Sequence, residues 1–565
     1  MIAAMAGRLP TGVSRSDADD GQRLVGLPLR VAQRVASATA DGAHTARVFR
    51  RAGILRPIRP DKLFRSGVAL ARWGPTPAAG FASSAIHYPD ETALIDELGR
   101  LSFEQVHRRT NALARALSDG GIGAGDGIAI MCRDHRWFVE ATIACSKLGA
   151  TALYLNTAFA GPQITEVVER EGPLALIYDQ EFSGMLSGAL RNRQGFVAWH
   201  DGDNPAHPIL EQLISSTDDS DLEPPPEPGR IVILTSGTTG APKGAQREPP
   251  GLGVAASLLS LIPLRRRETT LIAAPLFHSW GFAHFSLGML LSSTCVLRRR
   301  FDPEATLEAI ERHRPTALVV VPVMLQRIME LPDDRRHAYD TSSLRVVAAS
   351  GSTLPGELAA RFMDEFGEVL YNLYGSTEVA WATIATPVDL RAAPGTAGSP
   401  PRGTTLRILD DEGEEVPTGS TGRIFVSNEM LFEGYTGGGK KQVIGGLMST
   451  GDMGRLDEEG RLFVAGRDDE MIVSGGENVF PREVEDLLAH HDAISEAAVV
   501  GVEDAQFGQR LKAFVVKAPG AEVSADEVRS FVKSNLARFK VPRDVEFLDR
   551  LPRNPTGKVL KRELH

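Results

Sequence analysis

The stretch Ile231–Ala245, IVILTSGTTGAPKGA, decides how the rest of the sequence is interpreted. Its apolar start predicts a buried strand, which breaks at Thr235 into a run of hydroxyl residues and glycines. Glycines let the backbone turn its N–H groups toward one point, hydroxyls add donors, and Lys243 adds a mobile positive charge. We therefore predict a polyphosphate-binding loop rather than an ordinary polar turn. It is not the common P-loop, because Pro242 precedes the lysine and Gly244, not Ser or Thr, follows it.

Length and composition bound the class of protein. A chain of 565 residues is too long for one core and predicts two or more domains. The 42% hydrophobic and 24% charged residues are ordinary for a soluble protein, and no run approaches the ~20 apolar residues of a membrane helix. Cys132, Cys145 and Cys295 are too few and scattered for a disulfide framework or a zinc site, which favours a reducing cytoplasm. The net charge of −10 argues against nucleic-acid binding.

The first 75 residues differ from the rest in charge, with thirteen Arg or Lys against five Asp or Glu. The opening lacks the apolar core of a secretory signal, and Asp17, Asp19 and Asp20 argue against a transit peptide. Two explanations remain: peripheral contact with an anionic membrane, or a solvated extension wrapped on the main domain. The usual behaviour of charge runs favours the wrapped extension.

Strands and helices alternate along the chain at the spacing of a wound, largely parallel α/β sheet. The first run predicts a hairpin within 82–101, helices at Phe103–Leu117 and Trp137–Leu148, and strands at Gly127–Met131, Thr151–Leu155 and Leu174–Tyr178. An acidic, proline-rich linker, Asp218–Gly229, then leads into the phosphate loop. A second α/β run covers 270–400, and 395–465 predicts a turn-rich β part.

A compact α+β unit is predicted from Asp468 onward, with helices at Pro481–His490 and Ala525–Phe539 and strands at Ala497–Val502 and Leu511–Val516. The predicted division is a basic extension at 1–80, a large domain at 81–467 and a small C-terminal domain at 468–565.

Three further segments carry polar chemistry. Tyr374 and Glu378 follow a predicted strand, where ligands of wound α/β folds collect, so the ring can stack on a base and the carboxylate can hold Mg²⁺. The alternative for this segment is a helix N-cap at Thr377. Asp452 lies on a tight turn and can hold ribose hydroxyls, and Lys558 lies on a loop after Pro and Gly. Each of these signals is weak alone.

Together, the segments TSGTTGAPKG, APLFHSWGF (274–282), YGSTE, STGD, GRDDEMIVSGGENVFP and NPTGK resemble the adenylate-forming superfamily of acyl-CoA synthetases, adenylation domains and luciferases. The resemblance covers about residues 80 to 565. It implies that a large domain binds ATP with Mg²⁺ and a carboxylate, and that a small domain swings between adenylate formation and transfer to coenzyme A. The chain departs from the pattern before STGD, where the frequent tryptophan is absent and glycines are numerous.

The resemblance also implies roles for individual residues. Phosphate binding falls to Thr235, Ser236, Gly237, Thr238, Thr239, Gly240 and Lys243. The residues implied to contact the adenine base are Gly351, Ser352, Thr353, Tyr374 and Gly375. Thr377 is implied to contact the α-phosphate, and Asp452 and Arg467 the ribose. The resemblance implies that Glu378 binds magnesium and that Asp469 is the hinge. It also implies that the CoA arm passes Gly475 and Gly476, and that His278 is the gate between the acyl and CoA sides. The catalytic candidates are Lys558, Glu378, Thr238 and His278.

The acyl pocket is expected at His278, Trp280, Gly281 and Ala380, where the sequence is small and apolar as a hydrocarbon tunnel requires. We therefore predict a medium- to long-chain fatty acid–CoA ligase. The alternatives are an aryl- or other carboxylate–CoA ligase and a fatty acyl-AMP ligase that feeds a carrier protein. A non-catalytic nucleotide-binding regulator is opposed by the joint presence of Lys558, Glu378 and Asp452. Chain length and oligomeric state stay open.

Overall fold

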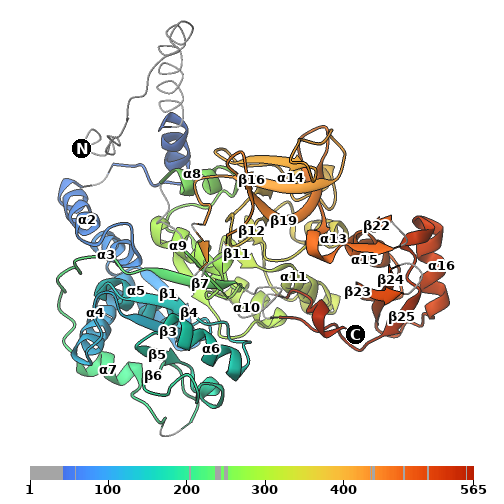
Figure 1. Cartoon of the computed structure of the whole chain (residues 1–565). Helices are drawn as coiled ribbons and strands as arrows, with labels where there is room; N and C mark the ends of the chain where they lie inside the picture. The colour runs from blue at the N-terminus through green and yellow to red at the C-terminus, as the bar shows by residue number, and fades with distance from the viewer. Residues whose placement is uncertain are drawn as a thin grey trace, which may run out of the picture.

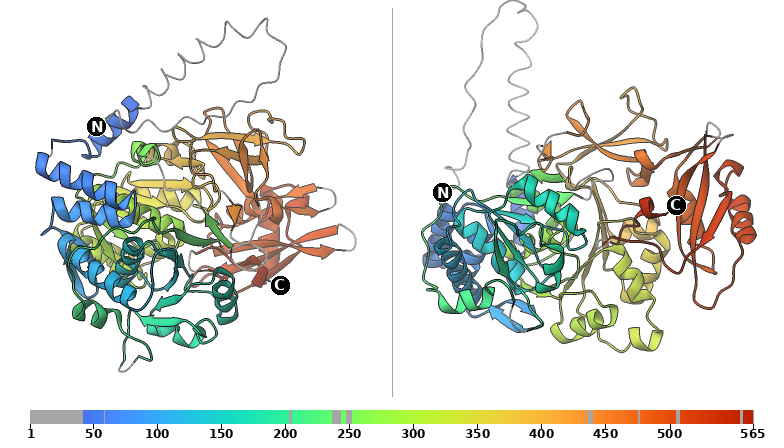
Figure 2. Two further views of the ribbon diagram at one scale, coloured as in Figure 1. Left: turned by 60° about the vertical axis from the view of Figure 1, so that its left-hand side comes forward. Right: turned by 60° about the horizontal axis from the view of Figure 1, so that its bottom comes forward.

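The computed structural model describes residues 42–57, 59–202, 205–235, 243–246, 252–432, 434–435, 440–474, 477–504, 508–554 and 557–564. Within these residues the chain forms two wound α/β sheets, a smaller antiparallel sheet and a separate C-terminal sheet (Figure 1). The N-terminal helices and the C-terminal sheet lie at opposite ends of the molecule in every view (Figures 1 and 2). The predicted α/β fold class is confirmed.

The seven-stranded sheet carries the phosphate-loop motif. Its order is β17 (Gly434–Tyr435), β8 (Lys243–Gln246), β7 (Ile231–Thr235), β4 (Thr151–Tyr154), β3 (Gly127–Met131), β5 (Ala175–Tyr178) and β6 (Gln194–Val197). The strands from β7 to β6 are parallel, whereas β8 and β17 add antiparallel pairs at the edge. The central strands are almost wholly apolar because helices bury both faces of a parallel sheet.

The eight-stranded sheet carries the other large-domain motifs. Its order is β14 (Thr383–Ala385), β13 (Leu370–Tyr374), β12 (Val346–Ala349), β11 (Ala317–Val320), β9 (Thr269–Ile272), β10 (Thr294–Leu297), β1 (Thr92–Asp96) and β2 (Gly99–Ser102). The run from β13 to β1 is parallel, and each end is closed by an antiparallel partner. The loops after β9, β11, β12 and β13 therefore leave the same edge of one sheet.

Helices of the large domain connect and cover these strands. They are α2 (Pro60–Trp73), α3 (Pro77–His87), α4 (Phe103–Asp119), α5 (Arg136–Leu148), α6 (Gly161–Glu171), α7 (Leu210–Ser216), α8 (Leu252–Leu261), α9 (Ser279–Leu291), α10 (Pro303–His313), α11 (Pro322–Met329), α12 (Asp333–Arg336), α13 (Gly356–Phe366) and α14 (Pro387–Ala392). Their starts follow the sequence: Ser102 caps α4 in a full capping box, and proline stands in the first turn of α2, α3, α10 and α11.

The two smaller sheets follow along the chain. One contains β15 (Thr405–Leu409), β16 (Gly422–Ser427), β19 (Leu447–Leu456), β18 (Val443–Ile444) and β20 (Leu462–Arg467). The C-terminal sheet contains β22 (Glu477–Val479), β21 (Ile472–Ser474), β24 (Gly508–Lys517), β23 (Ile494–Asp504) and β25 (Asp544–Phe547), with helices α15 (Pro481–Leu488) and α16 (Ala525–Asn535). The short 3₁₀ turn η3 (Asp468–Glu470) joins the two sheets. The domain limits proposed from the sequence stay predictions.

Two local predictions differ from the structure. The hairpin forms from Thr92 to Ser102, but the residues before it belong to α3, because Thr76 caps a proline-started helix there. The helix N-cap at Thr377 is absent, and the segment after β13 is a turn in which Ser376 Oγ accepts N–H bonds from Glu378 and Val379 at 3.2 and 3.4 Å.

The acidic linker Asp218–Gly229 is attached to the domain rather than free. Asp219 pairs with the two guanidinium nitrogens of Arg108 at 2.8 and 2.7 Å, and Asp221 lies 3.1 Å from His107. Both partners lie on α4.

The part of the N-terminal region that the structure describes is packed on the large domain. Val48 and Phe49, from a helix over 42–51, and Ala52, in the turn after it, belong to the main hydrophobic core, and Trp73 of α2 packs beside α3. Among the residues that the structure describes, no helix is both long and apolar enough to cross a membrane.

Candidate active site

The predicted nucleotide residues meet around the carboxylate of Asp452. The Tyr374 hydroxyl donates a 2.5 Å hydrogen bond to Asp452 Oδ2, and Arg467, its cross-strand neighbour in β20, lies 3.8 Å from Oδ1. Burial raises the pKa of the Asp452 carboxyl, while the Tyr374 bond and the nearby charges of Arg467, Lys558 and Lys441 oppose the rise. Burial also raises the pKa of Tyr374 well above its usual value, so this hydroxyl keeps its proton. The site therefore holds one carboxylate among several cationic and polar groups.

The predicted magnesium ligand, Glu378, accepts a 2.5 Å hydrogen bond from the Tyr435 hydroxyl through Oε1. Sequence reasoning missed Tyr435, which reaches Glu378 because β17 pairs with β8 at the edge of the phosphate-loop sheet. A carboxylate oxygen held at the carboxyl end of a sheet fits the hard oxygen ligand that Mg²⁺ prefers. The donor chemistry present in the chain therefore fits this metal.

The candidate adenylation lysine, Lys558, lies in a tight turn held against α11 of the large domain. The Lys558 N–H donates to Asn554 Oδ1 at 2.9 Å, and Asn554 N–H donates back to the Lys558 carbonyl at 2.9 Å. Between them Gly557 has φ +77°, and a Cβ there would lie only 2.2 Å from Cγ1 of Val323. Only glycine fits this turn against the helix.

Polar contacts hold the same turn from the side. Arg553 donates to Glu496 Oε2 at 3.0 Å and to the Gly557 carbonyl at 2.6 Å, while Gln326 of α11 donates to Glu496 Oε1 at 3.4 Å. The C-terminal sheet therefore contacts α11, and Lys558 lies near enough to Asp452 for its charge to act on that carboxyl.

Several predicted residues cannot be placed in full. Thr235 and Lys243 pair across the antiparallel strands β7 and β8, but their side chains lie outside the described residues. Outside the described residues also lie Ser236, Gly237, Thr238, Thr239, Gly240, Gly475 and Gly476. Asp469 lies in the turn η3, and its side chain is not described. Gly351, Ser352 and Thr353 follow β12, the strand beside β13, so they share an edge with Tyr374 and Gly375.

The residues predicted for the acyl side are partly or fully buried and carry no charge near neutral pH. Burial lowers the pKa of His278 and of His284 to about 4, so both rings are uncharged near neutral pH. His278 Nε2 is buried with no hydrogen-bond partner in the described part of the chain. The Trp280 indole donates to the Val320 carbonyl at 3.0 Å and packs edge-on against His284, with ring centroids 4.2 Å apart.

At two of the expected pocket residues, Gly281 and Ala380, the backbone has an unusual geometry. A Cβ at Gly281 would lie 2.4 Å from the Pro275 carbonyl oxygen and 2.5 Å from that of Ala274, so this glycine allows α9 to pack on its own preceding loop. Ala380 has φ +61°, a left-handed conformation that alanine rarely adopts. Asn428 donates 2.8 Å hydrogen bonds to the carbonyls of the residues on both sides of Ala380, which holds the turn.

A buried carboxyl supports the acyl-side segment and was not found from the sequence. Asp134 Oδ1 accepts the Leu276 N–H at 2.9 Å, and burial raises the pKa of Asp134 to about 8. Beside it, Cys132, His135 and Asp179 lie within metal-ligand distance of one another. His135 Nε2 lies 2.8 Å from Asp179 Oδ1 and Nδ1 accepts the N–H of the residue two positions on, so both ring nitrogens are already bonded. We therefore interpret His135 and Asp179 as a hydrogen-bonded structural pair beside the Cys132 thiol, not as metal ligands.

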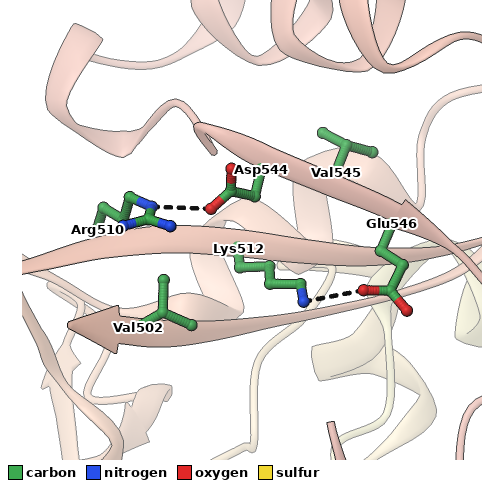
Figure 3. A pocket seen from close by; sticks show the side chains of 6 residues that line it. All are labelled: Val502, Arg510, Lys512, Asp544, Val545 and Glu546. Atoms are coloured by element: carbon green, nitrogen blue, oxygen red, sulfur yellow. Dashed lines mark hydrogen bonds and ion pairs between the residues drawn. The ribbon is translucent and has the colours of Figure 1, made fainter. Parts of the chain in front are cut away.

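One hollow lies away from these residues, on the C-terminal domain (Figure 3). It is lined across β23, β24 and β25, and its charged groups form two ion pairs, Arg510 with Asp544 at 2.8 Å and Lys512 with Glu546 at 2.9 Å. Because its charges are mutually paired, we assign it no part in the chemistry.

Comparison with known proteins gives matches over most of the chain. The family model described as AMP-binding enzyme matches residues 81–436, and that of the AMP-binding enzyme C-terminal domain matches 483–558. A feruloyl-CoA synthase of Amycolatopsis is 33% identical over 487 residues, which cover 84% of this chain and 96% of that protein. An indoleacetate–CoA ligase of Aromatoleum aromaticum is 34% identical over 484 residues, covering 84% and 94%.

Among solved structures, that of the anthranilate CoA ligase AuaEII in complex with anthranoyl-AMP matches with a TM-score of 0.78 and 26% identity, covering 86% of this chain and 96% of that one. ATP, Mg²⁺ and coenzyme A, expected from the motifs, are the cofactors and co-substrate of such ligases. The two family models, the long relatives and the shared fold agree with the motif order along the sequence. The chain belongs to the family of AMP-binding enzymes.

Proposed function

We propose that this chain is an AMP-forming carboxylate–CoA ligase whose acid carries an aromatic or other ring. The observation that carries the ligase assignment is the held turn of Lys558 beside Asp452, in a chain matched by both family models. Feruloyl, indoleacetyl and anthraniloyl groups in the names of the relatives support a ring-bearing acid. The predicted fatty acyl substrate receives no support from these three relatives, and the aryl alternative fits them better.

The acyl-side chemistry agrees with this substrate class. The segment 274–282 contains no Lys, Arg, Asp or Glu, and the pKa of His278 is lowered to about 4, so nothing there would pair with an ammonium group. The aromatic groups of Trp280, His278 and Phe277 offer ring faces and edges, which attract another ring more than they attract an alkyl chain. An amino acid is therefore a poor candidate.

The first half-reaction joins a carboxylate oxygen to the α-phosphorus of ATP and breaks the bond to the departing pyrophosphate. Both reactants are anionic, so positioned cations and donors lower the barrier. Lys558 and the phosphate-loop groups would supply this charge, and Asp452 with Tyr374 would orient the ribose. A magnesium ion on Glu378 would neutralise phosphate charge.

In the second half-reaction the CoA sulfur bonds to the acyl carbon, the bond from that carbon to the adenylate oxygen breaks, and AMP leaves. No cysteine nucleophile is needed, which agrees with three cysteines that are all buried. Before this step the C-terminal domain must move, because Lys558 and its turn occupy the large-domain contact at Val323. We place the hinge at Asp469.

The test compares acids of equal carbon number, phenylacetate against octanoate and cinnamate against nonanoate, in CoA-dependent AMP release. We expect kcat/KM for the ring acid to exceed that for its aliphatic partner by about tenfold or more. Equal or better use of the aliphatic partners would reject the ring assignment while keeping the ligase assignment. Pyrophosphate release without any CoA thioester would instead indicate a carrier-protein acceptor.

A further inference from the structure

The outer face of α2 exposes an unusual amount of apolar surface. Phe64 is 73% exposed, Leu63 47%, Leu70 48% and Val68 38%, and Leu55, just before the helix, is 50% exposed. These are five of the ten large apolar residues that are exposed in the described part of the chain. Contiguous apolar exposure of this kind marks a surface that is covered by something else.

The helix is nevertheless firmly attached by its other face. Ala69 and Trp73 are buried against α3, Lys62 Nζ donates to the His87 carbonyl at 2.8 Å, and Ser66 Oγ lies 2.8 Å from His87 Nε2. Because the inner face is fixed, the exposed face is presented at the outer edge of the molecule, on the left of Figure 1. The apolar surface is therefore a permanent feature of the fold.

Positive charge surrounds this apolar face. Within 42–75 the chain has eight Lys or Arg residues and, in the same range, one acidic residue, Asp61. Two of these eight, Arg65 and Arg72, are exposed on α2, where Arg72 also pairs with Glu223 at 3.4 Å. The rest of the chain is acidic enough to give the whole protein a net charge of −10, so this end is oppositely charged.

Three guanidinium groups also gather at Tyr88, next to the start of α2. Arg56, Arg266 and Arg267 lie 5.6, 5.3 and 4.7 Å from the centroid of its ring. Burial, together with the charges of Arg56 and Arg267, lowers the pKa of Arg266 to about 10. Within the described residues, Arg266 Nε and the Tyr88 hydroxyl are buried without a hydrogen-bond partner. Arg267 also pairs with Glu91, whereas Arg56 and Arg266 have no ion pair among the described residues, so a bound anion would stabilise these two cations.

We propose that this face, formed by α2 and the arginines at Tyr88, docks the enzyme on an anionic lipid surface. Phe64, Leu63 and Val68 enter the boundary between headgroups and acyl chains, and the arginines contact lipid phosphates. A helix of fourteen residues is about 21 Å long, too short to span a bilayer but suited to lying in its interface. The proposal is independent of the acid that the ligase activates.

The test measures co-sedimentation of the full chain with vesicles of phosphatidylcholine alone or with about 30% phosphatidylglycerol. We expect at least tenfold stronger binding to the anionic vesicles, and loss of most of it when salt is raised to about 0.5 M. Phe64→Ser should weaken binding by about tenfold, and Arg56→Gln with Arg65→Gln should remove the preference for anionic vesicles.

Matched controls come from the opposite part of the large domain. Val388→Ser alters an apolar side chain that is 75% exposed on α14, and Arg361→Gln alters an exposed arginine on α13. Both should bind vesicles like the unchanged protein. All variants should keep full turnover on soluble acids, because none of these side chains lies among the candidate active-site residues.

Three results would overturn the proposal. The first is equal binding to neutral and anionic vesicles, and the second is no binding to either. The third is a dimer in light scattering that Phe64→Ser dissociates while vesicle binding is unaffected, since a second copy of the chain would then cover this face.

Discussion

The two sides of the candidate active site are built from different forces. On the nucleotide side, one short hydrogen bond joins Tyr374 to Asp452, and an ion pair joins Asp452 to Arg467. On the predicted acyl side, His278 and Trp280 are uncharged and pack against neighbouring rings, and one hydrogen bond joins the Trp280 indole to the Val320 carbonyl. Charged and polar contacts require particular residue types, whereas packing requires only volume and shape. The motifs therefore identify the nucleotide chemistry but leave the acid undetermined.

The largest effect is expected at the boundary of the two sides, where we propose that Lys558 contacts the reacting phosphate. Lys558→Ala should slow adenylate formation by about two to three orders of magnitude, since one such contact contributes roughly 3–4 kcal/mol to the transition state. Conversion of supplied acyl-adenylate and CoA to thioester should be unchanged. Pyrophosphate exchange and thioester formation, measured separately, check this.

The control for the loss of charge is Lys533→Ala, which alters an exposed lysine on α16 and should leave both half-reactions intact.

Asp469→Pro should have the opposite effect to Lys558→Ala, because proline fixes φ near −65° and the proposed hinge could not rotate. If Lys558→Ala and Asp469→Pro slow both steps equally, the division of labour between two domain positions is wrong.

The next effect concerns shape alone. Gly557→Ala places a methyl group against Val323 and should unseat the lysine turn, slowing adenylate formation by about one to two orders of magnitude while sparing thioester formation. Gly520→Ala is the matched control: its φ of +74° nearly equals the +77° of Gly557, but nothing lies within 4 Å of the added methyl group. Equal behaviour of the two variants in pyrophosphate exchange would mean that backbone strain, not the fit to α11, explains the glycine.

A smaller effect is expected within the nucleotide side. Tyr374→Phe removes the hydrogen bond to Asp452, and a bond to a charged group contributes roughly 1.5 kcal/mol, so KM for ATP should rise about tenfold. That bond also lowers the pKa of Asp452, which burial raises. Losing it shifts the pKa further upward, so the acid limb of kcat/KM for ATP should move to higher pH. An unmoved acid limb in the pH profile would show that Asp452 ionisation does not control ATP binding.

The smallest effect is expected on the acyl side. Ala380→Gly relieves a left-handed alanine at φ +61°, and the gain of roughly 1 kcal/mol is partly offset by the greater freedom of glycine in the unfolded chain. The melting temperature should rise slightly or stay the same. KM for the acid should change, whereas KM for ATP should not, if the methyl group lines the acyl pocket. Parallel changes in both constants would place Ala380 outside that pocket.

Much of the fold could be predicted because its strands are apolar runs of characteristic length. Gly127–Met131 is a strand with the predicted limits, and α5 begins one residue before the predicted helix. The helix limits that differed, such as α15 ending at Leu488, concern final turns where capping and tertiary packing decide.

Contacts between distant segments could not be predicted. Tyr435 reaches Glu378 only because a two-residue strand pairs with β8, and Asp134 supports Leu276 across a long separation in sequence. Gly281 resembled a tunnel-lining residue because its close approach to the Pro275 carbonyl is invisible in the sequence. A larger residue at Gly281 would therefore disturb the packing of α9 before it tested the length of the substrate.

The attachment of Asp218–Gly229 to α4 has a consequence for dissecting the protein. Its prolines and acidic residues suggest an ideal place to cut the chain, since proteases favour exposed, unbonded segments. Yet Asp219 and Asp221 hold this segment to Arg108 and His107, so its backbone is not free to enter a protease cleft. Limited digestion should spare it, and a gene divided there would yield two halves that each expose half of a shared sheet, since β7 pairs with β4.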